Sequence, residues 1–264
     1  MSRDSVIDEL GRLYDLTARL RRECPWDRRQ TQESIIAYTL EETYELADSI
    51  RQRGERGDAA VCGELGDLLF QVFFLACLAE EQGLYDLGEV AAGIRAKLIR
   101  RHPHVFGAAN AETPEEVREN WETIKREAEG REGIFHDIPE TFPSTLLAQK
   151  LQQRAAAVGF DWERAADVMD KIKEETAELE HEVAAGGDSE RQAAEVGDLL
   201  LSVVNLARKL KVDPELALRD SALRFRERVE AAAWSAEEDG LVFESMGLDQ
   251  QEAYYQRAKK EQKP

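Results

Sequence analysis

Apolar residues recur every three or four positions along most of the chain, and stretches in which apolar and polar residues alternate are nearly absent. The first spacing gathers apolar side chains on one face of an α-helix, whereas alternation is typical of a half-buried β-strand. The sequence therefore predicts an all-α protein. Glycine, proline and capping residues mark where helices begin and end. By these signals the first half contains helices over residues 3–22, 31–53, 58–82, 87–102 and 113–129.

A segment rich in proline and glycine separates this half from a second series of helices. It holds Gly130, Gly133, Pro139 and Pro143, residues that interrupt helices and favour turns. We therefore expect an N-terminal helical module over residues 1–108, a linker with a short helix over 109–143 and a C-terminal module over 144–264. The helices expected after this segment cover residues 144–158, 163–185, 189–210, 214–238 and 249–262.

Two acidic motifs of the first series return in the second. The sequence EETYEL at residues 41–46 reappears as EETAEL at 174–179, and ELGDLL at 64–69 reappears as EVGDLL at 195–200. Between the last acid of the first motif and the first acid of the second lie 18 residues in one copy and 16 in the other. A repeat of this kind indicates two copies of one supersecondary unit. The predicted fold is therefore a tandem repeat of two helical-bundle modules.

The acids of these motifs share helix faces, because residues three or four positions apart on a helix point to the same side. A short loop makes the two helices antiparallel neighbours, so their acidic faces can converge. Carboxylates at close range repel one another unless a cation neutralises them, and oxygen ligands select Mg²⁺ or, as a substitute, Mn²⁺. These acids are Glu41, Glu42, Glu45, Glu64 and Asp67 in the first copy and Glu174, Glu175, Glu178, Glu195 and Asp198 in the second.

Acids at helical spacing are also common on solvated helix faces. Taken alone, the run from Glu41 to Glu45 fits a solvated face equally well. The second motif favours the metal interpretation. Asp67 and Asp198 directly precede two of the most apolar stretches of the chain, residues 68–70 and 199–201. We expect these stretches to face the core, where an acid is costly unless it is paired or bound to a cation.

Basic and aromatic residues near the acids are candidates for binding a phosphorylated ligand, because Mg²⁺ sites with several carboxylates commonly handle phosphates. Lys97 with Arg101, and Arg224 with Arg228, lie one helical turn apart and can reach the same polyanion. The alternatives are ordinary surface charge for the basic residues and core packing for the aromatic ones. The remaining candidates are Lys171, four residues before Glu175, and Trp26 and Trp162, which precede the acidic helices and can stack on a base.

Composition and charge exclude several classes of protein. The 264 residues include 35 Lys and Arg against 54 Asp and Glu, a net charge of −19 that opposes nucleic-acid binding. Three scattered cysteines favour neither a disulfide framework nor a zinc site. The first twenty residues lack the apolar core of a signal peptide, and the longest apolar stretch, residues 68–79, is shorter than the ~20 residues of a membrane span. We therefore expect a cytoplasmic protein that binds neither nucleic acid nor membranes.

Together with further segments, the acidic motifs resemble the MazG family of nucleoside triphosphate pyrophosphohydrolases, within the all-α NTP pyrophosphatase superfamily. The likeness covers nearly the whole chain. It implies an Mg²⁺-dependent hydrolysis of a nucleoside triphosphate to the monophosphate and diphosphate, by attack of water at the α-phosphorus. The further segments are CPWD at residues 24–27, YTLEE at 38–42, GELGDLLF at 63–70, RRHPHVF at 100–106, VGFDW at 158–162 and VVNLAR at 203–208.

The resemblance also implies roles for individual residues. Arg224 and Arg228 match the family's phosphate-binding Lys and Arg, and Tyr255 stands where the family often has a Trp for the base. Glu174, and Glu41 in the first copy, match a residue that acts as a general base or contacts the nucleotide. Family members look like homodimers with sites completed near the interface, and some work mainly through the C-terminal copy. The implied metal ligands are Glu175, Glu178, Glu195 and Asp198, and correspondingly Glu42, Glu45, Glu64 and Asp67.

Two other functions stay open at this stage. One is a helical regulatory or interaction protein whose acidic sites bind Mg²⁺-nucleotide without turning it over. The other is a narrower pyrophosphatase of the dUTP or dCTP type, against which the tandem architecture argues.

Overall fold

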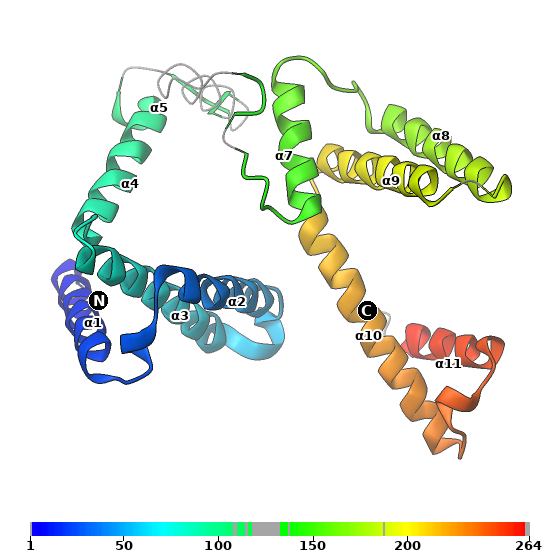
Figure 1. Cartoon of the computed structure of the whole chain (residues 1–264), viewed down its shortest axis with the longest axis horizontal. Coiled ribbons are helices and arrows are strands. Elements are labelled where there is room, and N and C mark those ends of the chain that lie inside the picture. Colours follow the sequence, from blue (N-terminus) through cyan, green and yellow to red (C-terminus); the bar gives the residue numbers. More distant parts are fainter. Residues whose placement is uncertain are drawn as a thin grey trace. The chain divides into compact units, whose positions relative to one another are not determined.

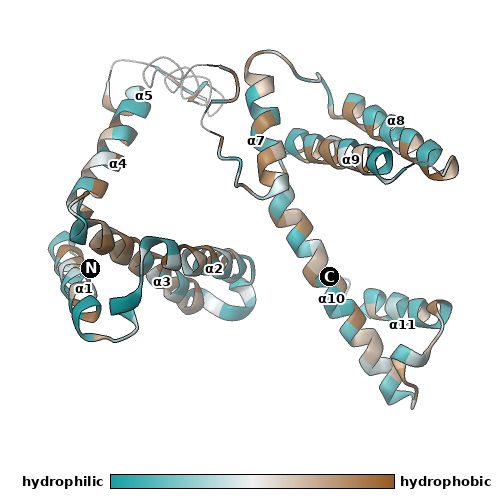
Figure 2. Ribbon diagram, in the orientation of Figure 1, coloured by the Kyte–Doolittle hydropathy of each residue, from teal (hydrophilic) through white to brown (hydrophobic). Residues whose placement is uncertain are grey.

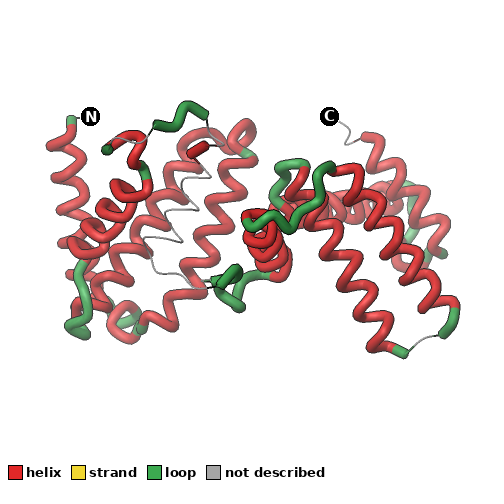
Figure 3. The backbone as a smooth tube through the Cα atoms, turned by 90° about the horizontal axis from the view of Figure 1, so that it is seen from above, coloured by secondary structure: helices red, strands yellow, loops and turns green. Residues whose placement is uncertain are grey.

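The all-α prediction is confirmed in a computed structural model, which describes residues 2–107, 110–113, 116–117, 133–136, 138–186 and 188–261. These residues form helices and loops and no strand (Figures 1 and 3). The chain divides into two compact units, residues 1–121 and 122–264, and each contains one copy of the repeat. Of the helix predicted over 113–129, all but Thr113 and residues 116–117 lies outside the described residues.

The observed helices follow the predicted ones closely. In the first unit they are α1 (Arg3–Glu23), α2 (Gln32–Arg51), α3 (Arg53–Glu81), α4 (Leu87–Arg101) and the short α5 (Pro103–Phe106), with a 3₁₀ turn at Asp27–Arg29. In the second they are α7 (Ser144–Ala157), α8 (Ala165–Ala184), α9 (Ser189–Lys209), α10 (Pro214–Glu238) and α11 (Leu248–Glu261), with a 3₁₀ turn at Phe243–Ser245.

Local side-chain chemistry sets the starts of α2 and α9, two of the four helices that carry an acidic motif. Thr31 caps α2 in a reciprocal pair with Ser34, whose backbone N–H donates to the Thr31 hydroxyl. In the second unit, Asp188 accepts from the N–H groups of Glu190 and Arg191 and so begins α9. Gly57, at φ 79° and ψ 171°, interrupts the helical backbone of α3, so the regular part of that helix begins near the predicted start.

In the first unit α2 and α3 form an antiparallel pair that holds the small core (Figure 1). Ile35 of α2 is buried against Phe74 and Leu78 of α3. Helix α1 packs on the end of α3, where Arg21 forms a bidentate ion pair with Glu81. Helix α4 meets α3 where the two helices join and extends away from α2 (Figure 1). The acidic motifs on α2 and α3 therefore lie on neighbouring helices, as predicted.

The second unit repeats this arrangement with α8 and α9. These two helices pack on each other, and α7 packs on α9, where the Gln152 side chain donates to the carbonyl of Leu201 at 2.8 Å. Val168 of α8 and Val204 of α9 are buried. Helix α10 contacts α7 and then runs beside α11 (Figure 1). The unit thus consists of an α8–α9 pair and an α10–α11 pair, joined through α7 and the start of α10.

The two apolar stretches differ in how far they face the core. Phe70, in the stretch after Asp67, packs against the core residues Ile35, Phe74 and Leu78, as expected. The stretch after Asp198 is largely exposed, which corrects the expectation there. Leu200 is 60% exposed and Leu201 is 44% exposed. On α3 and α9 the exposed residues form equivalent stripes with helical spacing, and Figure 2 shows the apolar residues of these helices in brown. We call them the α3 stripe (Leu65, Leu69 and Val72) and the α9 stripe (Val196, Leu200 and Val203).

Helix α3 is the one described helix that is long and apolar enough to cross a bilayer, judged by length and composition alone. Its buried residues include Phe73, Phe74 and Leu78, which pack inside the first unit. It also carries Glu64 and Asp67 in its middle. A core helix of a globular unit has the same composition, and the packing of α1 and α2 on α3 supports that interpretation.

Candidate functional site

The first acidic cluster lies between α2 and α3. Carboxylate oxygens of Glu42, Glu45 and Glu64 lie within 4.8 Å of one another, close enough to hold one metal ion. Glu42 and Glu64 are half-buried and Glu45 is exposed. The hydroxyl of the buried Ser49 also contacts Glu64, at 3.4 Å. The spacing of three residues on α2 and the antiparallel pairing with α3 together create this cluster.

The second cluster has the same origin on α8 and α9. Here the carboxylates of Glu175, Glu195 and Asp198 lie within 4.8 Å of one another. Glu175 is only 5% exposed, so its charge is costly without a cationic neighbour. In each copy the structure brings together three of the four predicted ligands. Asp67 and Glu178 lie outside these tightest groups.

The fourth acids are nevertheless near enough to the clusters to act electrostatically on Glu42 and Glu195. Burial raises the pKa of Glu42, and the charges of Asp67, Glu45, Glu64 and Glu41 raise it further. Burial also raises the pKa of Glu195, followed by the charges of Glu178, Asp198, Glu175 and Glu182. Both clusters therefore concentrate negative charge that a divalent cation would stabilise. The oxygen ligands and their closeness fit Mg²⁺.

Lys171 distinguishes the second cluster from the first. Its Nζ atom lies 2.7 Å from Glu175 and 2.9 Å from Glu174. These two contacts raise the pKa of Lys171, so it carries a positive charge at neutral pH. Tyr38 stands at the equivalent position of the first copy, three residues before Glu41. Its ring meets that of Trp26 edge-on, with centroids 5.6 Å apart, so both aromatic rings lie near the start of α2.

The basic pairs lie on other helices than the acids, and the structure does not place them against the clusters of the same unit. Arg224 and Arg228 lie midway along α10, which extends away from the α8–α9 pair (Figure 1). Lys97 and Arg101 occupy α4, which likewise extends away from α2, and Arg101 is buried. Sequence spacing placed each pair on one helix correctly but could not indicate which acids it would face.

Tyr255 of α11 belongs to the same part of the second unit as the basic residues of α10. Its ring lies 5.9 Å from that of Phe225, the residue after Arg224. Phe225 is 60% exposed. An aromatic pair thus flanks the predicted phosphate-binding arginines, which is a suitable arrangement for a base beside a phosphate chain.

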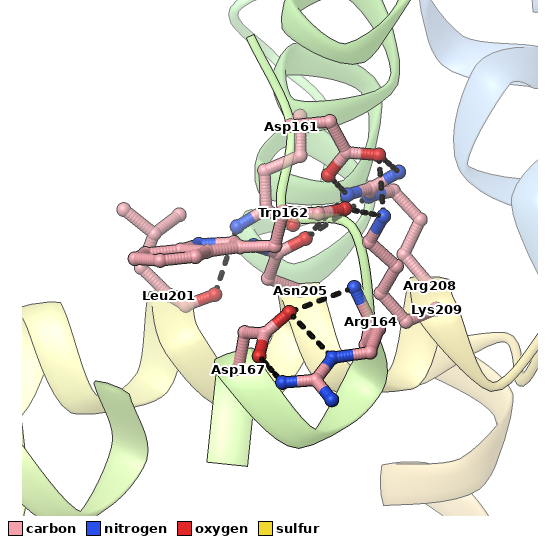
Figure 4. Close-up of polar contacts among 9 residues, drawn as sticks. Asp161, Trp162, Arg164, Asp167, Leu201, Asn205, Arg208 and Lys209 are labelled. Carbon is pink, nitrogen blue, oxygen red and sulfur yellow. Dashed lines mark hydrogen bonds and ion pairs between the residues drawn. The ribbon is translucent and has the colours of Figure 1, made fainter. Parts of the chain in front are cut away.

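A group of charged residues that carried no predicted role holds the loop before α8 (Figure 4). Asp161 accepts hydrogen bonds from Arg208 and from Lys209, the latter at 2.6 Å, and Lys209 also donates to the carbonyl of Trp162. Arg208 further donates to Asn205 at 2.7 Å. We call Asp161, Arg208 and Lys209 the loop clamp. The sequence did contain a signal for this group, because Asp161 and Arg208 lie in two of the segments that carry the family resemblance.

The loop clamp fixes a loop that exposes aromatic side chains. Trp162 is 45% exposed and Phe160 is 83% exposed. The clamp's own side chains are between 13% and 23% exposed. Because Lys209 binds both the carboxylate of Asp161 and the backbone of Trp162, it holds the predicted base-stacking residue in place at the start of the α8 helix.

Comparison with known proteins identifies the family. Residues 30–106 match the model of the MazG nucleotide pyrophosphohydrolase domain, a range that includes the whole first cluster. The nucleoside triphosphate pyrophosphohydrolase of Escherichia coli K12 is 40% identical over 263 residues, covering 97% of this chain and 99% of that protein. The chain belongs to the MazG family. The MazG protein of Thermotoga maritima, named a nucleoside triphosphate pyrophosphohydrolase/pyrophosphatase, is also 40% identical and covers 89% of each chain.

A crystal structure of a MazG-related protein from Thermotoga maritima aligns with 44% of this chain and 99% of its own, at 24% identity and a TM-score of 0.39. Membership of the MazG family rests on the sequence relatives. Because these relatives align along nearly the full chain, both copies of the repeat belong to the shared MazG architecture.

Proposed function

We propose that this MazG enzyme hydrolyses nucleoside triphosphates to the monophosphate and diphosphate, with Mg²⁺ held by the acidic clusters and water attacking the α-phosphorus. The observation that carries the proposal is the convergence, in each copy, of three carboxylates from two helices within 4.8 Å. Mn²⁺ would serve as a substitute, since it accepts the same oxygen ligands. The names of the relatives support the class of substrate.

In the C-terminal site Glu175, Glu195 and Asp198 would hold the metal, and Glu178 would be the fourth acid of the site. Bound Mg²⁺ supplies charge stabilisation of the phosphates and lowers the pKa of a bound water. The exposed Glu174 would accept a proton from the attacking water or contact the nucleotide. Arg224 and Arg228 would stabilise the negative charge that develops on the departing diphosphate.

We also propose that a second copy of the chain completes each site. Within one chain the arginines of α10 extend away from the α8–α9 pair, and the α3 and α9 stripes leave apolar surface exposed. A homodimer would cover those stripes and bring a basic helix to the acids of its partner. The net charge of −19 supports the further proposal that the enzyme binds neither nucleic acid nor anionic membranes, and we also propose that it is cytoplasmic.

Product analysis across the eight canonical NTPs and dNTPs with Mg²⁺ tests the proposed reaction. We expect the monophosphate and diphosphate in equal amounts, because attack at the α-phosphorus breaks the α–β bond. Release of inorganic phosphate with a nucleoside diphosphate would contradict it. Binding without any product would favour the regulatory alternative, and turnover of dUTP or dCTP alone would favour the narrower pyrophosphatase.

Subunit mixing tests whether two chains build one site. In a background with Glu42→Gln and Glu64→Gln, the Glu175→Gln variant and the Arg224→Ala/Arg228→Ala variant are each expected to be inactive at the C-terminal site. After equal mixing and subunit exchange, about a quarter of the sites would combine intact acids with intact arginines in a symmetric dimer. Activity near that fraction is expected. No recovery, with exchange verified by mass spectrometry, would show that each chain builds its own site.

A further inference from the structure

We propose that Lys171 is a built-in counter-cation that makes the two acidic clusters bind Mg²⁺ differently. The N-terminal cluster binds the metal by itself, whereas the C-terminal cluster binds it tightly only together with a nucleoside triphosphate. This inference rests on the proposed function, because it takes both clusters as metal sites. It concerns the order in which metal and nucleotide enter the C-terminal site.

The position of Lys171 places its charge on the carboxylate that the metal needs most. Its Nζ atom lies 2.7 Å from Glu175, whose side chain is 6% exposed, and the Lys171 side chain is itself 32% exposed. A close ion pair at a mostly buried carboxylate is little weakened by solvent. A metal ion that binds Glu175 therefore competes with a cation that the helix already supplies, four residues away on the same face.

The first cluster has no such cation among the described residues. Tyr38 replaces the lysine, and its ring is occupied with Trp26. No Lys or Arg in the described part of the chain forms an ion pair with Glu42, Glu45 or Glu64. Each copy contributes five acids from its two motifs, and within the described part of the chain only the second copy adds a positive charge in direct contact with them.

One unit charge at this distance changes the affinity for a divalent ion substantially. At an effective dielectric constant near 20, and allowing for partial exposure, we expect Mg²⁺ to bind the C-terminal cluster about ten- to hundredfold more weakly than the N-terminal cluster when nucleotide is absent. A triphosphate reverses this difference. It offers the flexible ammonium of Lys171 new anionic partners, which frees Glu175 for the metal. Metal and nucleotide then bind with positive coupling at this site.

Titration calorimetry of Mg²⁺ into the full-length protein without nucleotide tests the inference. We expect a tighter and a weaker class of site, assigned by Glu42→Gln/Glu45→Gln and by Glu195→Gln/Asp198→Asn. Lys171→Met should strengthen the weaker class by about tenfold or more, and Tyr38→Lys should weaken the tighter class. Lys173→Met is the matched control, since Lys173 lies on the same helix, is 71% exposed and pairs with Asp170. It should change neither class.

The possible results separate this inference from the proposed function. Equal affinity of both clusters, unaltered by Lys171→Met, would overturn the inference and leave the metal sites in place. Failure of Mg²⁺ to bind either cluster, with or without a non-hydrolysable triphosphate, would overturn the metal assignment itself. Because Tyr38 is 40% exposed, Tyr38→Lys should fold. A weaker N-terminal site in that variant, with an unchanged melting temperature, would support the inference independently of Lys171.

Discussion

Glu175→Gln is expected to reduce turnover at the C-terminal site by about 10²–10³-fold or more. The N-terminal site is inactivated in this experiment by Glu42→Gln and Glu64→Gln. The substitution keeps the volume of the side chain and its ability to accept a hydrogen bond from Lys171, but removes the buried charge that would hold the metal. Diphosphate release under saturating Mg²⁺ is the measurement. The melting temperature should change little, because the change also relieves repulsion among the carboxylates.

Glu180→Gln is the matched control for this experiment, because Glu180 lies on the same helix and is exposed outside the cluster. It should keep the activity of the parent. If the Glu175→Gln variant retained full activity with an ordinary Mg²⁺ dependence in that background, Glu175 would not be a metal ligand. Loss of activity together with unfolding would instead assign Glu175 a structural role.

Arg208→Met is expected to be among the most destabilising single changes in the second unit. It leaves Asp161 with Lys209 alone and removes the contact with Asn205, in a place where the paired side chains are only 13% and 23% exposed. Breaking such a pair should lower the free energy of unfolding by about 2–3 kcal/mol. Urea unfolding followed by circular dichroism measures the change. Arg12→Met is the control, because the Arg12–Glu9 pair is exposed and is expected to contribute ~0–1 kcal/mol.

The loop clamp should also show a characteristic pH dependence. Burial acts to raise the pKa of Asp161, but the hydrogen bonds and charges of Arg208 and Lys209 outweigh it and hold that pKa below its ordinary value. The unfolded chain therefore binds more protons, and the stabilisation is present above about pH 4 and lost as the pH falls through the folded pKa. The difference between parent and Arg208→Met should shrink in acid. A difference that stays constant down to about pH 2 would exclude the ion pair as its cause.

The sequence was informative about helices and about the acidic motifs, because both depend on spacing along one or two neighbouring helices. Thr31 begins α2 as predicted, and Glu42, Glu45 and Glu64 converge across one short connection. Side chains that meet across long separations were beyond this reasoning. Asp161 and Arg208 are 47 residues apart, and periodicity does not show that they touch.

The exposed leucines show a second limit of sequence reasoning. Helical periodicity identifies an apolar face but does not say which chain covers it. Leu200 and Leu201 follow Asp198 in a run that resembles a core segment, yet both remain exposed in one chain. The same limit applies to Arg224 and Arg228, whose helix the sequence locates correctly and whose partner acids it does not. The exposure and the partners of these residues depend on how helices pack on one another, and the local sequence pattern does not show this packing.

The α3 and α9 stripes occupy the same positions of the repeat and differ only in having Leu65 where the other has Val196. A stripe of this kind can pack on the same stripe of a second chain or on the other stripe of that chain. Contact between unlike stripes would link chains head to tail into an open polymer. When two chains join through like stripes, the first contact raises the effective concentration of the second, which favours a closed pair over an open fibre. Two like stripes in one chain thus allow open polymers, and their covalent linkage favours the closed pair instead.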